Sequence, residues 1–546
     1  MEALHLNLKS IQEQKASWEA QGFKLPQYDI EKVRENTKKH PRWVHFGAGN
    51  IFRAFPARIQ DELLDEGLVD YGVIVAETFQ PAKLKLIFDR HDCLSTAVTL
   101  KGDGDLDLRV VGAIAETVEA DGEDPDQWAR IVEIFRQESL SVVSFTITEK
   151  GYSIRDSQGK LQAYVEDQMK DPFMKATNTP GLITKLLAER FEAGAYPLTL
   201  VSMDNCSHNG DLLKASVLAY AKAWVENGFL PEAFLAYVED DTKISFPWSM
   251  IDKITPVADE AVGRLLLEKG YQDIHGEDMG GRIQPPSYAN AEETEYLVIE
   301  DSFTNGRPLW DKKGIIFTDR ETVDRVETMK VTTCLNPLHT ALAVFGCLLG
   351  YNYIHDEMKD EDLLNLIKGI GYVESLPVVV NPGILDPKEF IDTVIEVRFP
   401  NPFLPDTPQR IATDTSQKVS VRYGKTLTQY LEQAPEKLKD LVYIPTVLAG
   451  WLRYLLAVDD EGQAMAVSPD PLKESLQEEL ASISLGNNEG SDDILRAILS
   501  RPALFGVDLA QCGLIEKVIE IFHEMKVPAK LEPIWKSSPE SNKAKT

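Results

Sequence analysis

Residues 43–53 read Trp-Val-His-Phe-Gly-Ala-Gly-Asn-Ile-Phe-Arg, and this stretch decides the fold class. Its first four residues have the composition of a buried strand, and the glycines that follow mark a tight turn. A helical pattern then runs to Gly67, and a second strand at 71–76 ends on Glu77. Strand, glycine turn, helix, strand and terminal acid form a βαβ unit of the dinucleotide-binding type.

The glycine turn is the predicted cofactor site. Its glycines let the backbone approach a pyrophosphate, and the following helix offers free N–H groups and the positive end of its dipole. Phe52 stands where the third glycine of G-x-G-x-x-G would be, so a purely structural βα turn remains an alternative. Glu77 would accept hydrogen bonds from the adenosine ribose hydroxyls and repel a 2′-phosphate, which favours NAD over NADP.

Two further apolar runs continue the alternation of strands and helices. Residues 140–147 end at the segment 148–152, and residues 198–203 end at Asp204 and Asn205. In open α/β sheets ligands bind beyond the carboxyl ends of the strands, so both endings are candidate site segments.

The pattern changes after about residue 320, where helical periods dominate. We therefore predict an α/β fold: a polar helical extension of one or two short helices outside the first domain (1–40), a doubly wound Rossmann-type domain (41–320), a mainly α-helical domain (321–535) and a disordered tail (536–546). The expected helices of the second domain span residues 340–349, 361–370, 387–398, 427–443, 446–457, 471–483, 492–500 and 508–525.

Composition narrows the classes of function. The chain has 546 residues and a formal charge of −30, from 87 acidic against 57 basic residues, which argues against a nucleic-acid or membrane-surface binder. No apolar run approaches the ~20 residues of a membrane span, and the N-terminus lacks a secretory pattern. The five scattered cysteines show no metal-ligand spacing and fit a reducing cytoplasm. A small-molecule partner is expected, no metal is expected, and the oligomeric state cannot be read.

Residues 330–339 read Lys-Val-Thr-Thr-Cys-Leu-Asn-Pro-Leu-His. They place an amine, a carboxamide and an imidazole within ten residues of the predicted helical domain. On a helix Asn336 and His339 share a face, whereas Lys330 lies about 120° away in projection. A lysine that can lose its proton, beside two hydrogen-bonding groups, suits proton transfer to or from an alcohol oxygen. A solvated Lys, a capping Asn and a packed His are the structural alternative.

Taken together, the motifs over roughly residues 43–420 resemble one family, the polyol-specific long-chain dehydrogenases and reductases. The matching segments are His45–Gly49 with Arg53, Thr146–Tyr152, Ser202–Asn205 with His208–Gly210, Phe246-Pro247, Ser249–Asp252, Ile254–Pro256, Glu327, Met329-Lys330, Asn336, His339, Asn401-Pro402, Asp406, Gln409-Arg410, Asp414, Ser416 and Lys418.

The resemblance implies a metal-free, NAD-dependent reaction and a role for each matching residue. Lys330 resembles the acid/base lysine, Asn205 and Asn336 the amides that hold the reacting oxygen, and His339 a substrate-hydroxyl contact. Glu327 is similar to a residue on the proton path, and Arg410, Lys418 and Asp252 match substrate-binding residues. The expected cofactor-binding residues are Gly47, Gly49, Asn50, Ile51, Phe52, Arg53, Glu77 and Glu149.

One departure from the family concerns the lysine segment. The family has Asn five residues after Lys, whereas here the step is six, with Pro337 where a glycine is common. One extra residue turns a helix by ~100°, so either the helix bulges locally or the Lys–Asn geometry has changed.

We expect reduction of fructuronate to mannonate with NADH, because an anionic sugar acid needs local cations such as Arg410 and Lys418. Tagaturonate/altronate and fructose/mannitol oxidoreductases remain alternatives. So do a sugar-acid epimerase that uses bound NAD transiently and a non-catalytic nucleotide sensor. A zinc alcohol dehydrogenase is disfavoured, since no Cys/His cluster has ligand spacing and His355-Asp356-Glu357 reads as an exposed helix start.

Overall fold

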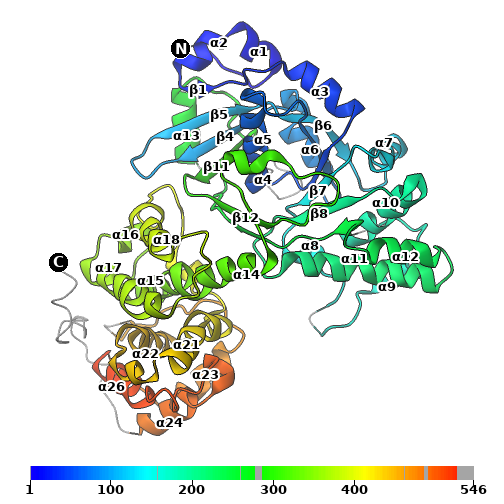
Figure 1. Cartoon of the computed structure of the whole chain (residues 1–546). Coiled ribbons are helices and arrows are strands. Elements are labelled where there is room, and N and C mark those ends of the chain that lie inside the picture. Colours follow the sequence, from blue (N-terminus) through cyan, green and yellow to red (C-terminus); the bar gives the residue numbers. More distant parts are fainter. Residues whose placement is uncertain are drawn as a thin grey trace. The chain divides into compact units, whose positions relative to one another are not determined.

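The structure is a computed structural model that describes residues 2–156, 158–176, 178–258, 260–276, 286–459, 462–484 and 490–525. The chain forms two compact units, Met1–Asp324 and Arg325–Thr546. Figure 1 shows strands with helices around them in the first unit and helices alone in the second. The predicted disordered tail at 536–546 lies outside the described residues.

The first unit is built on a six-stranded sheet of order β6-β3-β2-β7-β8-β9, in which each strand pairs in parallel with its neighbours. Its strands are β2 (Trp43–Phe46), β3 (Val73–Glu77), β6 (Ile114–Glu119), β7 (Val142–Phe145), β8 (Leu198–Ser202) and β9 (Ile244–Ser245).

Helices cover both faces of this sheet, because successive strand residues point to opposite sides. Val44 and Phe46 pack with α7 (Pro125–Arg136), α10 (Thr179–Gly194) and α11 (Asn209–Glu226). Trp43 packs instead with residues of α5 (Pro56–Asp65) and α6 (Ala82–Ile87). The expected doubly wound α/β fold is confirmed.

The helix expected after the glycine turn is two helices. The first, α4 (Asn50–Ala54), ends at Phe55, whose φ of −127° and ψ of −79° are not helical, and α5 starts at Pro56. Proline has no N–H and disfavours the α conformation of the residue before it, so the chain bends here.

The N-terminal segment is more closely integrated than the predicted outer extension of one or two helices. It forms α1 (Leu8–Glu13), α2 (Lys15–Ala20), β1 (Phe23–Lys24) and α3 (Ile30–Lys39). Strand β1 pairs with β5 (Leu106–Val111) at the edge of a second sheet, of order β1-β5-β4-β11, whose other strands are β4 (Ser95–Leu100) and β11 (Tyr288–Glu292). Trp18 of this segment is 0% exposed. Residues near the start of the chain therefore complete the first unit.

The remaining elements of the first unit surround these two sheets. They are α8 (Glu149–Tyr152), α9 (Ala163–Lys170), α12 (Glu232–Glu239), α13 (Glu260–Glu268), and a third sheet of β10 (Ser249–Asp252), β12 (Tyr296–Glu300) and β13 (Ile316–Thr318).

The second unit contains α-helices interrupted by π-helical segments, and helix α14 (Arg320–Met329) runs into it from the first unit. Its α-helices are α15 (Asn336–Leu349), α16 (Ile354–Glu357), α17 (Glu361–Lys368), α18 (Pro387–Thr393), α19 (Pro408–Ile411), α20 (Thr415–Val419), α21 (Lys425–Gln433), α22 (Tyr443–Leu455), α23 (Lys473–Leu480), α24 (Ser491–Leu499), α25 (Pro502–Phe505) and α26 (Ile515–Met525). The π segments are η3 (Lys330–Cys334), η4 (Gly369–Ser375), η6 (Val394–Arg398) and η7 (Ser420–Gly424).

Two expected helices of this unit are wrong in extent. The helix expected at 427–443 ends at Gln433, because Pro435 begins a 3₁₀ segment, and the next helix starts at Tyr443. The helix expected at 508–525 begins only at Ile515, after Gly513 at a φ of +68°. Proline and glycine ended both patterns.

The run Arg320–Leu349 is long and apolar enough, by length and composition, to cross a membrane, and 83% of its most apolar window is buried inside the structure. Among the described residues it is the one such run. Burial of this extent is what a core helix has, and it agrees with a soluble fold.

Candidate active site

The glycine turn after β2 has a conformation that requires Gly47. Its φ is +111°, and a Cβ built there would lie 2.4 Å from the carbonyl oxygen of Thr146. Gly49 differs, because its φ is −73° and a Cβ there would have no atom within 4 Å. Gly47 therefore shapes the turn, while Gly49 leaves open space at the start of α4.

Two residues predicted to contact the cofactor turn their side chains into the protein. Phe52 is 0% exposed and stacks on His45, with ring centroids 3.8 Å apart. Arg53 is also 0% exposed; it donates to Asn50 Oδ1 at 2.8 Å and to the Pro286 carbonyl at 2.9 Å. The cofactor-binding roles of Phe52 and Arg53 stay predictions; their side chains face the protein interior, where Arg53 holds the turn through its bonds to Asn50 and Pro286.

The acids predicted for this site differ in exposure. Glu77 ends β3, is 8% exposed, and accepts hydrogen bonds from the backbone N–H groups of Thr78 and Phe79, each at 3.1 Å. Glu149 is exposed in the short helix α8. Ile51 is partly buried. The ribose-binding role of Glu77 and the role of Glu149 stay predictions.

Asp204 organises the segment that follows β7. Its carboxylate accepts from the N–H of Ile147 at 2.8 Å, the N–H of Thr148 at 3.0 Å and the Tyr152 hydroxyl at 2.5 Å. Burial raises the pKa of Asp204 although these donors lower it. The carboxyl ends of β7 and β8 are thus joined, and Asn205 follows with an exposed side chain.

Asn209 performs the same task between β8 and β10. Its buried amide donates to the carbonyls of Asp204 and Ser249, both at 3.0 Å, and accepts from the Ser249 N–H at 3.0 Å. Asp252, at the end of β10, is 6% exposed. The first unit therefore brings the glycine turn, Glu77 and the 204–205 segment to the carboxyl ends of neighbouring parallel strands.

In the second unit Lys330 begins a π turn. The Leu335 N–H donates to the Lys330 carbonyl oxygen at 3.1 Å, a bond that spans five residues, and Lys330 is 2% exposed. The extra residue between Lys330 and Asn336 is therefore absorbed as a bulge, one of the two expected outcomes. Such single π turns recur at functional sites.

Proline explains where the bulge falls. Pro337 cannot donate to the carbonyl four residues earlier and its ring would collide with it, so a regular helix cannot continue across this point. Neighbouring segments hold the altered backbone: Tyr423 donates to the Pro337 carbonyl at 2.7 Å, and Thr426 to the Thr332 carbonyl at 3.1 Å. Asn336 then opens α15 and His339 lies one turn further on.

His339 lies among charged groups. Its Nε2 is 3.5 Å from Asp406, and its ring is tilted against Phe399 at 5.0 Å. Burial lowers the pKa of His339 to about 4, Asp406 opposes that shift, and Arg422, Arg410 and Arg398 reinforce it. His339 is neutral near pH 7, so it can hydrogen-bond a hydroxyl but brings no charge.

The predicted cations have different surroundings. Arg410 is exposed and pairs with Asp406, on the helix α19 that Thr407 caps by accepting from the Arg410 N–H at 3.2 Å. Lys418 is half-buried in α20 and donates to the Thr413 carbonyl at 2.5 Å, and burial together with the charge of Arg422 lowers its pKa. Glu327 is half-buried in α14.

Sequence reasoning missed Arg398 and Arg422, the two cations that π segments η6 and η7 carry beside His339. The i, i+4 spacing of Lys418 and Arg422, which places two cations on one face of a helix, could have indicated Arg422 from the sequence. Glu357 was also misjudged: the expected exposed helix start is wrong because Glu357 is 0% exposed, and burial raises its pKa to about 9.

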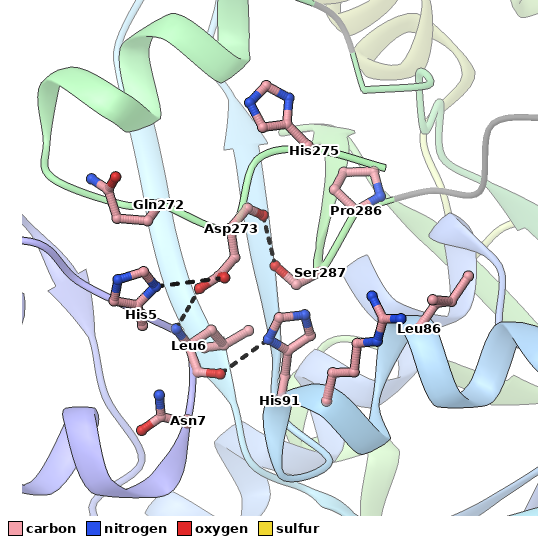
Figure 2. A pocket seen from close by; sticks show the side chains of 11 residues that line it. His5, Leu6, Asn7, Leu86, His91, Gln272, Asp273, His275, Pro286 and Ser287 are labelled. Carbon is pink, nitrogen blue, oxygen red and sulfur yellow. Dashed lines mark hydrogen bonds and ion pairs between the residues drawn. The ribbon is translucent and has the colours of Figure 1, made fainter. Parts of the chain in front are cut away.

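A cavity of about 420 Å³ lies elsewhere in the first unit, between the N-terminal segment and the end of α13. Figure 2 shows Asp273 at its centre, accepting from the Leu6 N–H at 2.6 Å and lying 3.8 Å from His5. None of the predicted site residues lines it, although its Pro286 is the residue whose carbonyl binds Arg53. Within the described part of the chain, no group of three or more His, Cys, Asp or Glu side chains could hold a metal ion.

A doubly wound sheet with a glycine turn, followed by a helical unit with a buried lysine, defines a two-domain protein of the Rossmann dehydrogenase class. The chain belongs to the mannitol dehydrogenase family: the model of the mannitol dehydrogenase Rossmann domain matches residues 41–312, and that of the mannitol dehydrogenase C-terminal domain matches residues 322–526.

Individual relatives agree with this assignment. A D-mannonate oxidoreductase of Thermotoga maritima is 47% identical over 96% of both chains. One of Escherichia coli is 28% identical over 87% of this chain and 91% of its own length. Among solved structures, a substrate-free D-sorbitol dehydrogenase aligns with a TM-score of 0.75 at 27% identity, covering 93% of this chain and 98% of its own. Mannitol 2-dehydrogenase of Pseudomonas fluorescens, solved with NAD and D-mannitol, aligns with a TM-score of 0.66 at 25% identity, covering 96% of each chain.

Proposed function

We propose that this protein is an NAD-dependent oxidoreductase that interconverts D-fructuronate and D-mannonate, a keto sugar acid and its polyol acid. The observation that carries the proposal is the set of cations around His339. Three arginines, Arg398, Arg410 and Arg422, act on its imidazole against the single carboxylate of Asp406. In a chain of net charge −30, a local excess of positive charge suits an anionic substrate.

Lys330 is the proposed acid and base. When bound, NADH supplies a hydride to the carbonyl carbon, and the carbonyl oxygen must then gain a proton. The Lys330 ammonium would donate that proton, and the neutral amine would take one back in the reverse direction. Lys330 is 2% exposed, which shields its amine from bulk water and suits proton exchange with a bound substrate.

Asn336 would donate a hydrogen bond to the developing alkoxide, a type of contact whose loss typically costs about 100-fold in rate. Neutral His339 would bind a substrate hydroxyl. The roles of Asn205, Asp252, Glu327, Arg410 and Lys418 remain those that the family resemblance implies. The five free cysteines are compatible with a reducing compartment, and we place the enzyme in the cytoplasm.

Loss of NADH absorbance with purified protein tests the proposal on a panel of D-fructuronate, D-tagaturonate and D-fructose. We expect kcat/KM to be highest for D-fructuronate. Turnover of tagaturonate or fructose without turnover of fructuronate would reassign the substrate. Conversion of a sugar acid without net NADH consumption would instead identify an epimerase.

A further inference from the structure

Arg422 is a half-buried cation with little to neutralise it. Among the described residues its hydrogen bonding consists of one bond, from Nη1 to the Thr340 hydroxyl, and no carboxylate forms an ion pair with it. Burial lowers the pKa of Arg422 to about 10, and the only opposing influence is the neighbouring Tyr423. A guanidinium carries five N–H donors, so most of its donors await a partner.

Two other arginines that are withdrawn from water, Arg190 and Arg109, have more partners than Arg422. Arg190 donates to the carbonyls of Phe135, Gln137, Leu140, Tyr196 and Pro197. Arg109 forms ion pairs with Asp61 at 2.9 Å and Asp65 at 2.8 Å. None of the nitrogens of Arg422 is among the fully buried atoms without a partner, so an anion from outside the chain can reach those that form no hydrogen bond and would neutralise the charge.

The surroundings of Arg422 belong to the candidate active site. Its one partner, Thr340, is the residue after His339 on α15. Its charge lowers the pKa of both His339 and Lys418. Two acids of this cluster are already engaged: Asp406 pairs with Arg410, and Asp470 accepts from the N–H and hydroxyl of Ser416. A third, Asp414, acts on the charge of Lys418 but not on that of Arg422.

We propose that Arg422 binds the carboxylate of the substrate and so selects sugar acids over neutral ketoses. The inference rests on the proposed function, of which it names the specificity-determining residue. A guanidinium can hold a carboxylate through two parallel hydrogen bonds, and Lys418, on the adjoining helix, adds a second positive charge. The neutral CH₂OH group of fructose gives neither contact.

The experiment compares D-fructuronate with D-fructose in the wild type, Arg422→Gln and Arg422→Lys. For fructuronate we expect Arg422→Gln to lower kcat/KM at least about 100-fold, mostly through KM, because truncating one partner of a buried charge pair is costly. For fructose we expect less than about a threefold change. Arg422→Lys, which keeps the charge without the fork, should fall between the two. Where fructose is not turned over, its inhibition constant against fructuronate replaces kcat/KM.

Arg501→Gln is the matched control, because it removes an arginine of the same unit that pairs at the surface with Glu479. It should change neither substrate's kinetics. Thr340→Val keeps Arg422 but removes its hydrogen-bond partner. It should lower kcat/KM for fructuronate, and not for fructose, by a smaller factor than Arg422→Gln does. A shift of the pH profile gives an independent readout: without the Arg422 charge, the pKa of His339 should rise.

The outcomes separate the inference from the proposed function. Equal losses for both substrates, or no loss for fructuronate, would overturn the role of Arg422 while leaving the oxidoreductase assignment intact. If another sugar acid replaces fructuronate as the best substrate, the same comparison is made with that acid. If only neutral ketoses are turned over, both proposals fail. Should Arg422→Gln not fold, Arg422→Lys and Thr340→Val decide the matter.

Discussion

The two units each depart from regular secondary structure at one decisive point, but by opposite means. In the first unit the departure needs a missing side chain: Gly47 has a φ of +111° and lies against the Thr146 carbonyl. In the second it needs an additional residue: Lys330 begins a π turn that Pro337 forces and Tyr423 anchors. The first device exposes backbone donors, whereas the second positions a side chain.

This difference predicts how each unit responds to change. In the glycine turn, where the shape of the backbone matters, we expect an added methyl group to be harmful and changes of nearby side chains to matter little. In the π turn, where side chains are proposed to do the chemistry, we expect small backbone changes to be tolerated but loss of a functional group to abolish activity.

The largest effect is expected for Lys330→Met, which keeps the length of the buried side chain and removes its amine. Loss of a general acid typically costs 10²–10⁴-fold, so we expect kcat to fall about 1,000-fold. The affinity for NADH, measured by fluorescence titration, should stay within about twofold, because cofactor binding depends on the first unit. Lys359→Met, an exposed lysine of the same unit, is the control. Retention of more than a tenth of the wild-type kcat would remove Lys330 from the mechanism.

The pair Gly47→Ala and Gly49→Ala tests the first unit. Gly47→Ala should destabilise the protein by about 2–4 kcal/mol, because its methyl group meets the Thr146 backbone at a φ unsuited to alanine. Gly49→Ala should leave the melting temperature unchanged, since nothing lies within 4 Å of the added Cβ. Both should weaken NADH binding, the second without a loss of stability. Equal melting temperatures for the two variants would contradict this account.

The buried acids of the two units should respond differently to a change of pH. Asp61, in the first, has its pKa raised to about 6 by burial but is held by Arg109 and Tyr28. Glu357, in the second, has a pKa of about 9 and no hydrogen-bond partner for either oxygen. The folded state therefore keeps a proton on Glu357 that the unfolded chain releases above the ordinary glutamate pKa of 4.5.

The contribution of Glu357 to the free energy of unfolding must then fall as pH rises from 4.5 to about 9. The fall is at most about 1.4 kcal/mol per pH unit. Glu357→Gln cannot release a proton. Its melting temperature should exceed that of the wild type by a margin that grows from pH 5 to pH 8. A margin that is constant with pH would show that Glu357 is ionised in the folded protein.

The smallest effect is expected for Tyr423→Phe, which removes the hydrogen bond to the Pro337 carbonyl at 2.7 Å. Leaving a buried carbonyl without its donor should cost about 1–3 kcal/mol of stability. If the anchor also positions the Lys330 turn, kcat should fall several-fold while the KM for NADH does not change. Tyr351→Phe, whose hydroxyl bonds to Asp360 in the same unit, should leave kcat unaffected.

Much of the fold was predictable because local patterns and tertiary structure agree. Strands β2, β3, β7 and β8 lie where apolar runs end at polar or glycine-rich segments. The predicted helix boundaries were wrong near Pro435 and Gly513, because the apolar periodicity continues through residues at which the helix is interrupted.

The candidate site was predictable as a set of residues but not as an arrangement. The motif and the family resemblance named Phe52 and Arg53 as cofactor-binding residues, but they could not show that both side chains are buried in α4. The sequence did not single out Arg422, because what distinguishes it is that it bonds to one hydroxyl group and to no carboxylate. The folded structure, not the local sequence, decides which groups surround it.

By itself the sequence determined the class of each unit, the position of the glycine turn and the lysine that we propose as the acid and base. These follow from periodicity, from the conformational freedom of glycine and from the chemistry of lysine, all of which are properties of short segments. Only the tertiary structure decided that the extra residue becomes a π turn, that Glu357 is buried and that Arg422 lacks an acid. Burial and charge pairing depend on segments far apart in the chain, so no local pattern contains them.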